Sequence, residues 1–235
     1  MNRKELEKAN SNIKYIDTKL PIFSSFFEFE GQVGRIPFGT VITITGSPGV
    51  GKTRYLLQVL EHIKASYPEK NVTLYEYEML PSHLFKVINS INSTKLDCFN
   101  FSIAPEVKKN NMILGIDSID QWAMNHYNSN YPTAEMAQWL KKSNDEFSPI
   151  IFQIHHKTKT TKVESGSALF PRQNSVTIDL LKQKDGTILA TTRRKNRWPS
   201  GIDQLILEHT ETGLKVKKEI SIRDAIQSFF TRIIK

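Results

Sequence analysis

The chain has 235 residues, 39% of them hydrophobic and 24% charged, which allows one large α/β domain with a sizeable core. This composition excludes a wholly disordered or fibrous protein, and the single cysteine, Cys98, excludes an internal disulfide and a cysteine-based zinc finger. The formal net charge of +8 favours a polyanionic partner such as nucleic acid.

The N-terminal 30 residues are predicted to form an arm that leads into the domain at residues 31–235. The arm begins with a charged segment, 2–12, that has helical character and then becomes aromatic at Phe23, Phe26, Phe27 and Phe29. Two placements are open for it: it packs on a neighbouring subunit, or it folds onto its own domain.

Alternating strands and helices follow the arm. The run Val41–Thr45 is β-branched at every position, and the segment after the next glycines carries apolar residues on one helical face, at Leu56, Leu57, Leu60 and Ile63. Further strands are predicted near 71–77, 98–103, 112–117 and 150–155, with helices near 81–91 and 133–147. This alternation is typical of βαβ units and a mainly parallel sheet.

The pattern changes after residue 156. Residues 157–173 are polar and basic, and strand-like pieces then follow near 176–181, 187–192, 205–208 and 214–216, with turn signals at 185–186 and 212–213. An amphipathic segment at 222–234 is predicted to be a helix. We therefore expect an α/β fold with a mainly parallel central sheet, flanking helices and C-terminal β-hairpins.

The strongest motif is GSPGVGKT at 46–53, a complete G-x-x-x-x-G-K-[ST] between a strand and a helix. Its glycines let backbone N–H groups surround phosphate oxygens, Lys52 neutralises β- and γ-phosphate charge, and the Thr53 hydroxyl is a ligand for Mg²⁺. We therefore predict that the chain binds ATP and Mg²⁺. The predicted nucleotide-binding residues are Gly46, Ser47, Pro48, Gly49, Val50, Gly51, Lys52, Thr53 and Arg54.

Acidic residues follow two of the predicted strands. The apolar run 112–116 ends in Asp117, which is the candidate partner of Thr53 at the metal. Glu76 and Glu78 both lie at the end of the strand NVTLYEYEM, and either one is a candidate to activate the attacking water. Their spacing alone does not separate the two.

Two basic segments remain. The run RRKNRWPSG at 193–201 is either a solvated edge or a source of cations for the γ-phosphate. The segment 157–173 poses the same choice between a solvated loop and a loop that grips nucleic-acid phosphates. Its candidate DNA-binding residues are Lys157, Lys159, Lys162 and Arg172.

Taken in order, the motifs RIPFGTVITITGSPGVGKT, LYEYEMLPSHL, MILGIDSIDQW, PIIFQIHHKT and RRKNRWPSG resemble the ATPase core of the RecA superfamily, in its RadA and DnaB-type helicase branch. The resemblance covers roughly residues 30–218. It implies a P-loop ATPase whose sites lie between subunits of a ring.

The resemblance also assigns roles to particular residues. It favours Glu78 as the catalytic glutamate, and it places a lysine and an arginine finger that act on the neighbouring subunit at Lys195 and Arg197. His155 falls where these families have a γ-phosphate-sensing residue, with Gln153 as a weaker candidate. Residues 157–173 match the DNA-binding loop region of such rings.

The chain departs from these relatives in what it lacks. With one cysteine and 235 residues, we expect neither the zinc finger and protease-like domain of RadA proteins nor the N-terminal helical domain of DnaB helicases. We therefore expect a stand-alone motor core.

The expected function is that of an ATP-dependent DNA motor that translocates on or unwinds DNA in replication or recombination. Its expected partners are single-stranded DNA, further copies of the chain in a hexameric ring, and a loading or replication protein. No apolar run is long enough to span a bilayer and the N-terminus lacks a signal peptide, so we expect no membrane contact. The expected location is cytoplasmic, at the nucleoid or in the host cytoplasm of a virus. The alternatives are a recombination or branch-migration accessory ATPase and a KaiC-like, nucleotide-switched scaffold.

Overall fold

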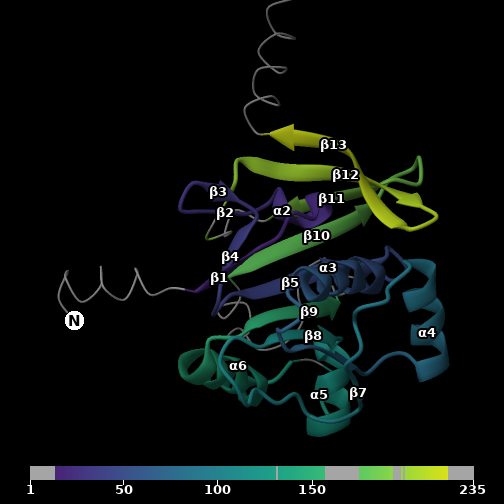
Figure 1. The fold of residues 1–235 in the computed structure, drawn as a ribbon. Helices are drawn as coiled ribbons and strands as arrows, with labels where there is room; N and C mark the ends of the chain where they lie inside the picture. Colours follow the sequence, from purple (N-terminus) through teal and green to yellow (C-terminus); the bar gives the residue numbers. More distant parts are fainter. Residues whose placement is uncertain (1–13, 131, 157–174, 193–196, 198, 222–235) are drawn as a thin grey trace, which may run out of the picture.

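The computed structural model describes residues 14–130, 132–156, 175–192, 197 and 199–221 (Figure 1). The segments 2–12 and 222–234, both predicted to be helical, lie outside these residues. Within the described part, strands form a nine-stranded sheet in the order β13-β12-β11-β10-β5-β9-β8-β6-β7, which Figure 1 shows from β13 at the top to β7 at the bottom.

The strands from β10 to β7 in this order are parallel. Their bounds are β5 (Val41–Gly46), β6 (Val72–Glu76), β7 (Phe99–Phe101), β8 (Ile113–Asp117), β9 (Ile150–His156) and β10 (Val176–Lys182). Because they are parallel, all their carboxyl ends meet at one edge of the sheet, where ligands bind in open α/β folds. The mainly parallel sheet predicted from the alternating pattern is confirmed.

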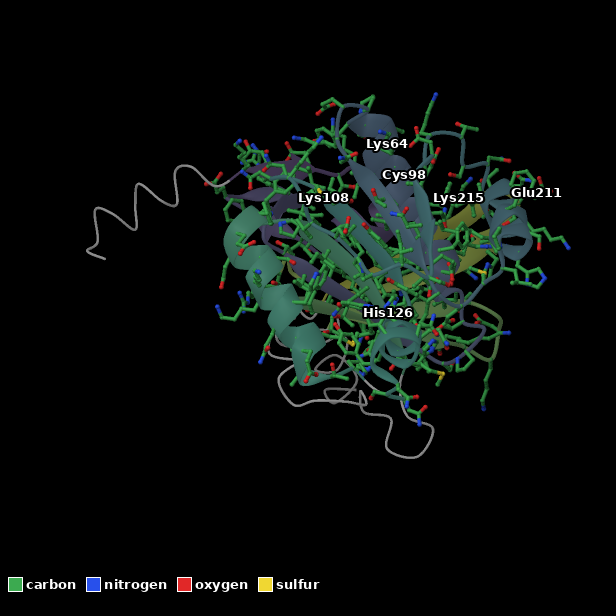
Figure 2. The ribbon with its side chains drawn as sticks, turned by 90° about the horizontal axis from the view of Figure 1, so that it is seen from below. Lys64, Cys98, Lys108, His126, Glu211 and Lys215 are labelled. Carbon is green, nitrogen blue, oxygen red and sulfur yellow. The ribbon has the colours of Figure 1, made fainter. Side chains whose placement is uncertain are left out.

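An antiparallel extension completes the sheet on the β10 side. It consists of β11 (Ile188–Thr192), β12 (Ile202–Thr210) and β13 (Gly213–Ser221), which are the C-terminal hairpins predicted from the turn signals. The outermost strand, β13, carries the exposed side chains of Lys215, Lys217 and Lys218. Figure 2 shows Lys215 and Glu211, both from the β12–β13 hairpin, at the side of the molecule away from Lys108. Lysines on an edge strand disfavour pairing with another sheet.

Helices cover both faces of the sheet. α3 (Lys52–Ser66) and α4 (Pro81–Ser90) pack on the face that carries Ile42, Ile44 and Phe152. α6 (Ala134–Phe147) packs on the opposite face, together with α5 (Ile119–Tyr127). The sequence analysis did not predict α5, although Ser118 caps it by accepting a hydrogen bond from the backbone N–H of Gln121.

Residues 14–30 pack on their own domain. β1 (Tyr15–Asp17) pairs with β4 (Arg35–Pro37), and α2 (Pro21–Ser24), β2 (Glu28–Phe29) and β3 (Gln32–Val33) lie between them in the chain. Five side chains of this segment are almost fully buried in the core: Ile16, Ile22, Phe23, Phe26 and Phe27. This part of the predicted arm therefore takes the second of the two open placements, while the boundary at residue 30 stays a prediction.

Within the residues that the structure describes, none of the helices combines the length and the apolar character needed to span a bilayer.

Candidate nucleotide-binding site

The glycine motif forms the turn between β5 and α3. Gly46 ends the strand with φ of 154°, and a Cβ atom built there would lie 2.5 Å from the carbonyl oxygen of Leu180. Gly51 has φ of 101° and precedes the first residue of α3. Only glycine fits both the close approach at the first position and the left-handed backbone at the second. Because α3 begins at Lys52, the loop ends at a helix N-terminus, which attracts anions.

Lys52 lies inside this loop. Its Nζ donates hydrogen bonds to the carbonyl oxygens of Gly46 (3.1 Å) and Ser47 (3.2 Å), and the residue is 6% exposed. Burial lowers the pKa of Lys52, while the nearby carboxylates of Glu78 and Asp117 oppose this shift. A cation held at a helix N-terminus in this way is suited to bind phosphate.

Thr53 and Asp117 meet beside the loop. The Thr53 hydroxyl donates to Asp117 Oδ2 at 2.6 Å, and Asp117 is 1% exposed at the end of β8. Burial, together with the charges of Glu76 and Glu78, raises the pKa of Asp117 to about 8. Its other oxygen, Oδ1, is buried without a hydrogen-bond partner among the described residues.

These oxygens fit a divalent cation. Mg²⁺ is usually bound through one or two side-chain oxygens together with substrate phosphates and water. Among the described residues there is no cluster of three or more histidine, cysteine or acidic side chains that would hold a metal on its own. A metal at this place would therefore depend on Thr53, Asp117 and the phosphates of a bound nucleotide.

The two glutamates after β6 have different surroundings. Glu76 is 1% exposed, and its Oε1 accepts hydrogen bonds from the backbone N–H groups of Glu78 (2.7 Å) and Met79 (2.8 Å). Burial raises the pKa of Glu76 to about 7. Glu78 instead lines the pocket, where its Oε1 accepts from the hydroxyl of Ser118. Glu76 thus stabilises the turn that follows β6, and Glu78 lines the pocket together with the phosphate loop.

A second partner of Glu78 is His156, which the sequence analysis did not single out. His156 Nε2 lies 2.5 Å from Glu78 Oε1, and the backbone N–H of His156 donates to Asp120 Oδ2 at 2.8 Å. Burial tends to raise the pKa of Glu78, but its hydrogen bonds with His156 and Ser118 lower it overall, and the bond to Glu78 raises the pKa of the imidazole. His156 is therefore poised to hold the Glu78 carboxylate.

Neither His155 nor Gln153 is among the described residues that line the pocket. Side chains alternate between the two faces of β9, so these two point away from the face that carries His156. His155 is fully buried with its Nε2 3.4 Å from Asp120 Oδ1, and Gln153 donates to the Thr43 hydroxyl at 2.9 Å. The phosphate-sensing role stays a prediction for His155, while the geometry places His156 at the pocket.

The described residues around the loop enclose a pocket of about 420 Å³. Of the predicted nucleotide-binding residues, the following line it: Pro48, Gly49, Gly51, Lys52, Thr53 and Arg54. Val50 is instead part of the hydrophobic core, and Ser47 is exposed. Glu78, Asp117 and His156 also line it, and the remaining lining residues are Val87 of α4 and His209 of β12.

Arg197 lies at the opposite end of the sheet from the phosphate loop. Its backbone N–H donates to the carbonyl of Ser175, whose own N–H donates to the carbonyl of Val41 at the start of β5. Gly46 is five residues further along that strand, or about 16 Å at 3.3 Å per residue. The exposed side chain of Arg197 therefore cannot reach the phosphate loop of its own chain.

The other predicted basic residues, Lys157, Lys159, Lys162, Arg172 and Lys195, lie outside the described residues. The chain enters the 157–174 segment from His156, beside the pocket, and leaves it at Ser175, beside Arg197. The segment therefore connects the carboxyl end of β9 with the amino end of β10.

Comparisons with known proteins identify the fold of the chain. No family model matches the chain, and no curated protein matches it. A solved structure of a KaiC-like protein from the archaeon Pyrococcus horikoshii OT3 matches with a TM-score of 0.65 and 16% identity. The structure of the flagellar accessory protein FlaH from Methanocaldococcus jannaschii matches with a TM-score of 0.64 and 16% identity. Each alignment covers 88% of this chain and 100% of the other.

The chain has the RecA-like fold. This confirms the α/β fold class and the RecA-like core expected from the motifs. The matched structures do not support the narrower RadA and DnaB-type branch.

Proposed function

We propose that the protein is a P-loop ATPase. The observation that carries this proposal is the convergence, in one pocket, of a glycine loop at a helix N-terminus, the Lys52 ammonium, the paired oxygens of Thr53 and Asp117, and the Glu78 carboxylate. These groups come from three strand ends, and their chemistry matches the parts that phosphoryl transfer requires.

Each group has a distinct task in hydrolysis. The loop N–H groups and Lys52 bind the phosphates, and Thr53 and Asp117 would hold Mg²⁺, which neutralises charge on the β- and γ-phosphates when bound. Glu78 orients a water molecule and accepts its proton, because its carboxylate is ionised and faces the loop. His156 and Ser118 hold that carboxylate in place.

We further propose that the active site is completed between subunits of a homo-oligomer, with a hexameric ring as the form expected from the family resemblance. Arg197 is exposed and too far from its own phosphate loop, so it can serve as an arginine finger only for the γ-phosphate bound by a second copy of the chain. Lys195 is the second cation proposed for this role.

The proposed work of the ATPase is on DNA. The net charge of +8 and the lysines at 157, 159 and 162 with Arg172 favour contact with the phosphates of single-stranded DNA, as in a translocase or helicase that a partner protein loads. A recombination accessory ATPase would use the same contacts. The similarity to a KaiC-like protein favours a second candidate, a nucleotide-switched scaffold that does not act on DNA.

Steady-state ATP hydrolysis at low salt, with and without single-stranded DNA, tests the proposal. Lys52→Ala serves as the blank, and light scattering records the oligomeric state in parallel. Stimulation by DNA that fades as salt rises would support a DNA motor, because phosphate contacts are salt-sensitive. ATP-dependent assembly with a rate indifferent to DNA would support the scaffold instead.

A further inference from the structure

Three residues of the pocket lining take no part in the proposed chemistry: Arg54 of α3, Val87 of α4 and His209 of β12. Hydrogen bonds through Arg54 and Ser90 connect them to one another, and we take them as a second end of the pocket. His209 is directly beside the phosphate loop, since a Cβ atom built on Gly51 would lie 3.8 Å from His209 Cε1. The terminal phosphate and the base are at opposite ends of an extended nucleoside triphosphate. If Glu78 marks the terminal phosphate, the nucleoside extends toward this second end.

A chain of hydrogen bonds fixes the side chains there. Arg54 Nη2 donates to the Ser90 hydroxyl at 3.0 Å, and that hydroxyl donates to the carbonyl of Val87 at 2.7 Å. Arg54 Nη1 lies 3.4 Å from Nδ1 of His209. These contacts tie α3, α4 and β12 together, so the guanidinium and the imidazole are held in position before any ligand arrives.

Arg54 also determines the tautomer and the charge of His209. A guanidinium has only donors, so Nδ1 of His209 accepts the hydrogen bond and the ring proton is on Nε2. Burial and the positive charges of Arg54 and Lys182 lower the pKa of His209, in agreement with a neutral ring. The one acceptor nitrogen of this ring is therefore already occupied by Arg54.

The side chains at this end consequently offer three things: the free N–H groups of Arg54, the Nε2–H of His209, and the apolar surface of Val87. Adenine presents an amino group beside N7, whereas guanine presents two acceptors, O6 and N7. None of these three described side chains offers a free acceptor that would recognise the adenine amino group. The flat faces of arginine and histidine stack on either base.

We propose that Arg54, Val87 and His209 form a purine subsite that stacks the base and donates N–H groups to it, and that does not select adenine over guanine. This inference rests on the proposed function, because it assumes that the phosphate loop binds a nucleoside triphosphate. GTP is then a substrate as well as ATP.

Base selectivity is the first test. We expect kcat/KM for GTP within about tenfold of that for ATP, since sites built to recognise a base hydrogen bond reject the analogue by about 10⁴-fold or more. A preference for ATP of more than about 100-fold would overturn the inference, because hydrophobic and stacking contacts alone do not reach that ratio.

Binding of His209→Ala is the second test, with ATP, GTP and inorganic tripolyphosphate as probes. Loss of one stacking partner should weaken ATP and GTP alike by about 5- to 100-fold and leave tripolyphosphate unchanged. His83→Ala, an exposed histidine of α4 outside the pocket lining, is the matched control and should bind all three as the wild type does.

The outcomes separate the two proposals. An equal loss of tripolyphosphate binding in His209→Ala would show that His209 contacts phosphates and would overturn the subsite. A wild-type chain that binds tripolyphosphate but no nucleotide also overturns the subsite and leaves the phosphate loop intact. A wild-type chain that binds none of the three overturns the proposed function itself.

Discussion

Replacement of Gly46 by alanine should destabilise the protein more than the same replacement at Gly49. Both residues have positive φ, 154° and 76°, so both variants incur backbone strain of about 1–2 kcal/mol. At Gly46 the new Cβ would also lie 2.5 Å from the Leu180 carbonyl oxygen and 2.9 Å from Cγ1 of Val50, whereas at Gly49 nothing lies within 4 Å. Such overpacking costs about 1–3 kcal/mol more.

The free energy of unfolding should therefore fall by about 2–5 kcal/mol in Gly46→Ala and by about 1–2 kcal/mol in Gly49→Ala. The effect of alanine on the unfolded chain is the same in both variants and cancels in the comparison. Urea unfolding followed by tryptophan fluorescence measures the difference, with the buried Trp122 as a reporter. Equal stability of the two variants would refute the close approach between the phosphate loop and β10.

Further predictions concern the neighbouring groups and the assembly. Glu61 accepts hydrogen bonds from Ser93 and from the backbone N–H groups of residues 94–96, and these lower its pKa below 4.5. Glu61→Gln should cost about 1–3 kcal/mol at pH 7 by urea unfolding. The difference in unfolding free energy between the wild type and Glu61→Gln should shrink as pH falls through the lowered pKa, because protonation of Glu61 weakens the hydrogen bonds that its carboxylate accepts. A difference that stays constant from pH 7 to pH 3 would contradict this prediction. His156→Ala should lower kcat for ATP by about 10- to 100-fold with little change in KM, since it frees Glu78 without touching the phosphate loop; an increase in KM alone would speak against a positioning role. Arg197→Ala should abolish turnover and retain ATP binding, and mixtures with Glu78→Gln should regain activity; no rescue at any mixing ratio would count against a shared site.

The sequence was sufficient for the part of the fold where local signals agree. The β-branched run 41–45, the glycine motif and the apolar face of 52–66 all point to a strand, a turn and a helix, and the structure has β5, the loop and α3 there. The short elements were missed for a physical reason. α5 has nine residues and buries only Ile119, Trp122 and Ala123, while β1 to β4 are two to three residues long and are fixed by packing rather than by their own periodicity.

The site was predictable where a sequence motif or the end of a predicted strand marks it, as at the phosphate loop, Asp117 and Glu78. The loop and Lys52 follow from one motif, but the contact between Glu78 and His156 joins residues 78 positions apart and depends on the strand order β6-β8-β9. The register that pairs Gly46 with His156 sets which histidine faces the pocket. His209 is 155 residues from Arg54, and no pattern within β12 marks it.

The most direct test of the central claim, that this pocket hydrolyses ATP with Glu78 as the base, is a comparison of ATP binding and hydrolysis in the wild type and Glu78→Gln. Equilibrium binding of labelled ATP and single-turnover hydrolysis are measured on the same samples, with Glu76→Gln as the variant of the turn-bracing glutamate. We predict that Glu78→Gln binds ATP as the wild type does and that its hydrolysis falls by about 100-fold or more. Unchanged hydrolysis in Glu78→Gln would contradict the account.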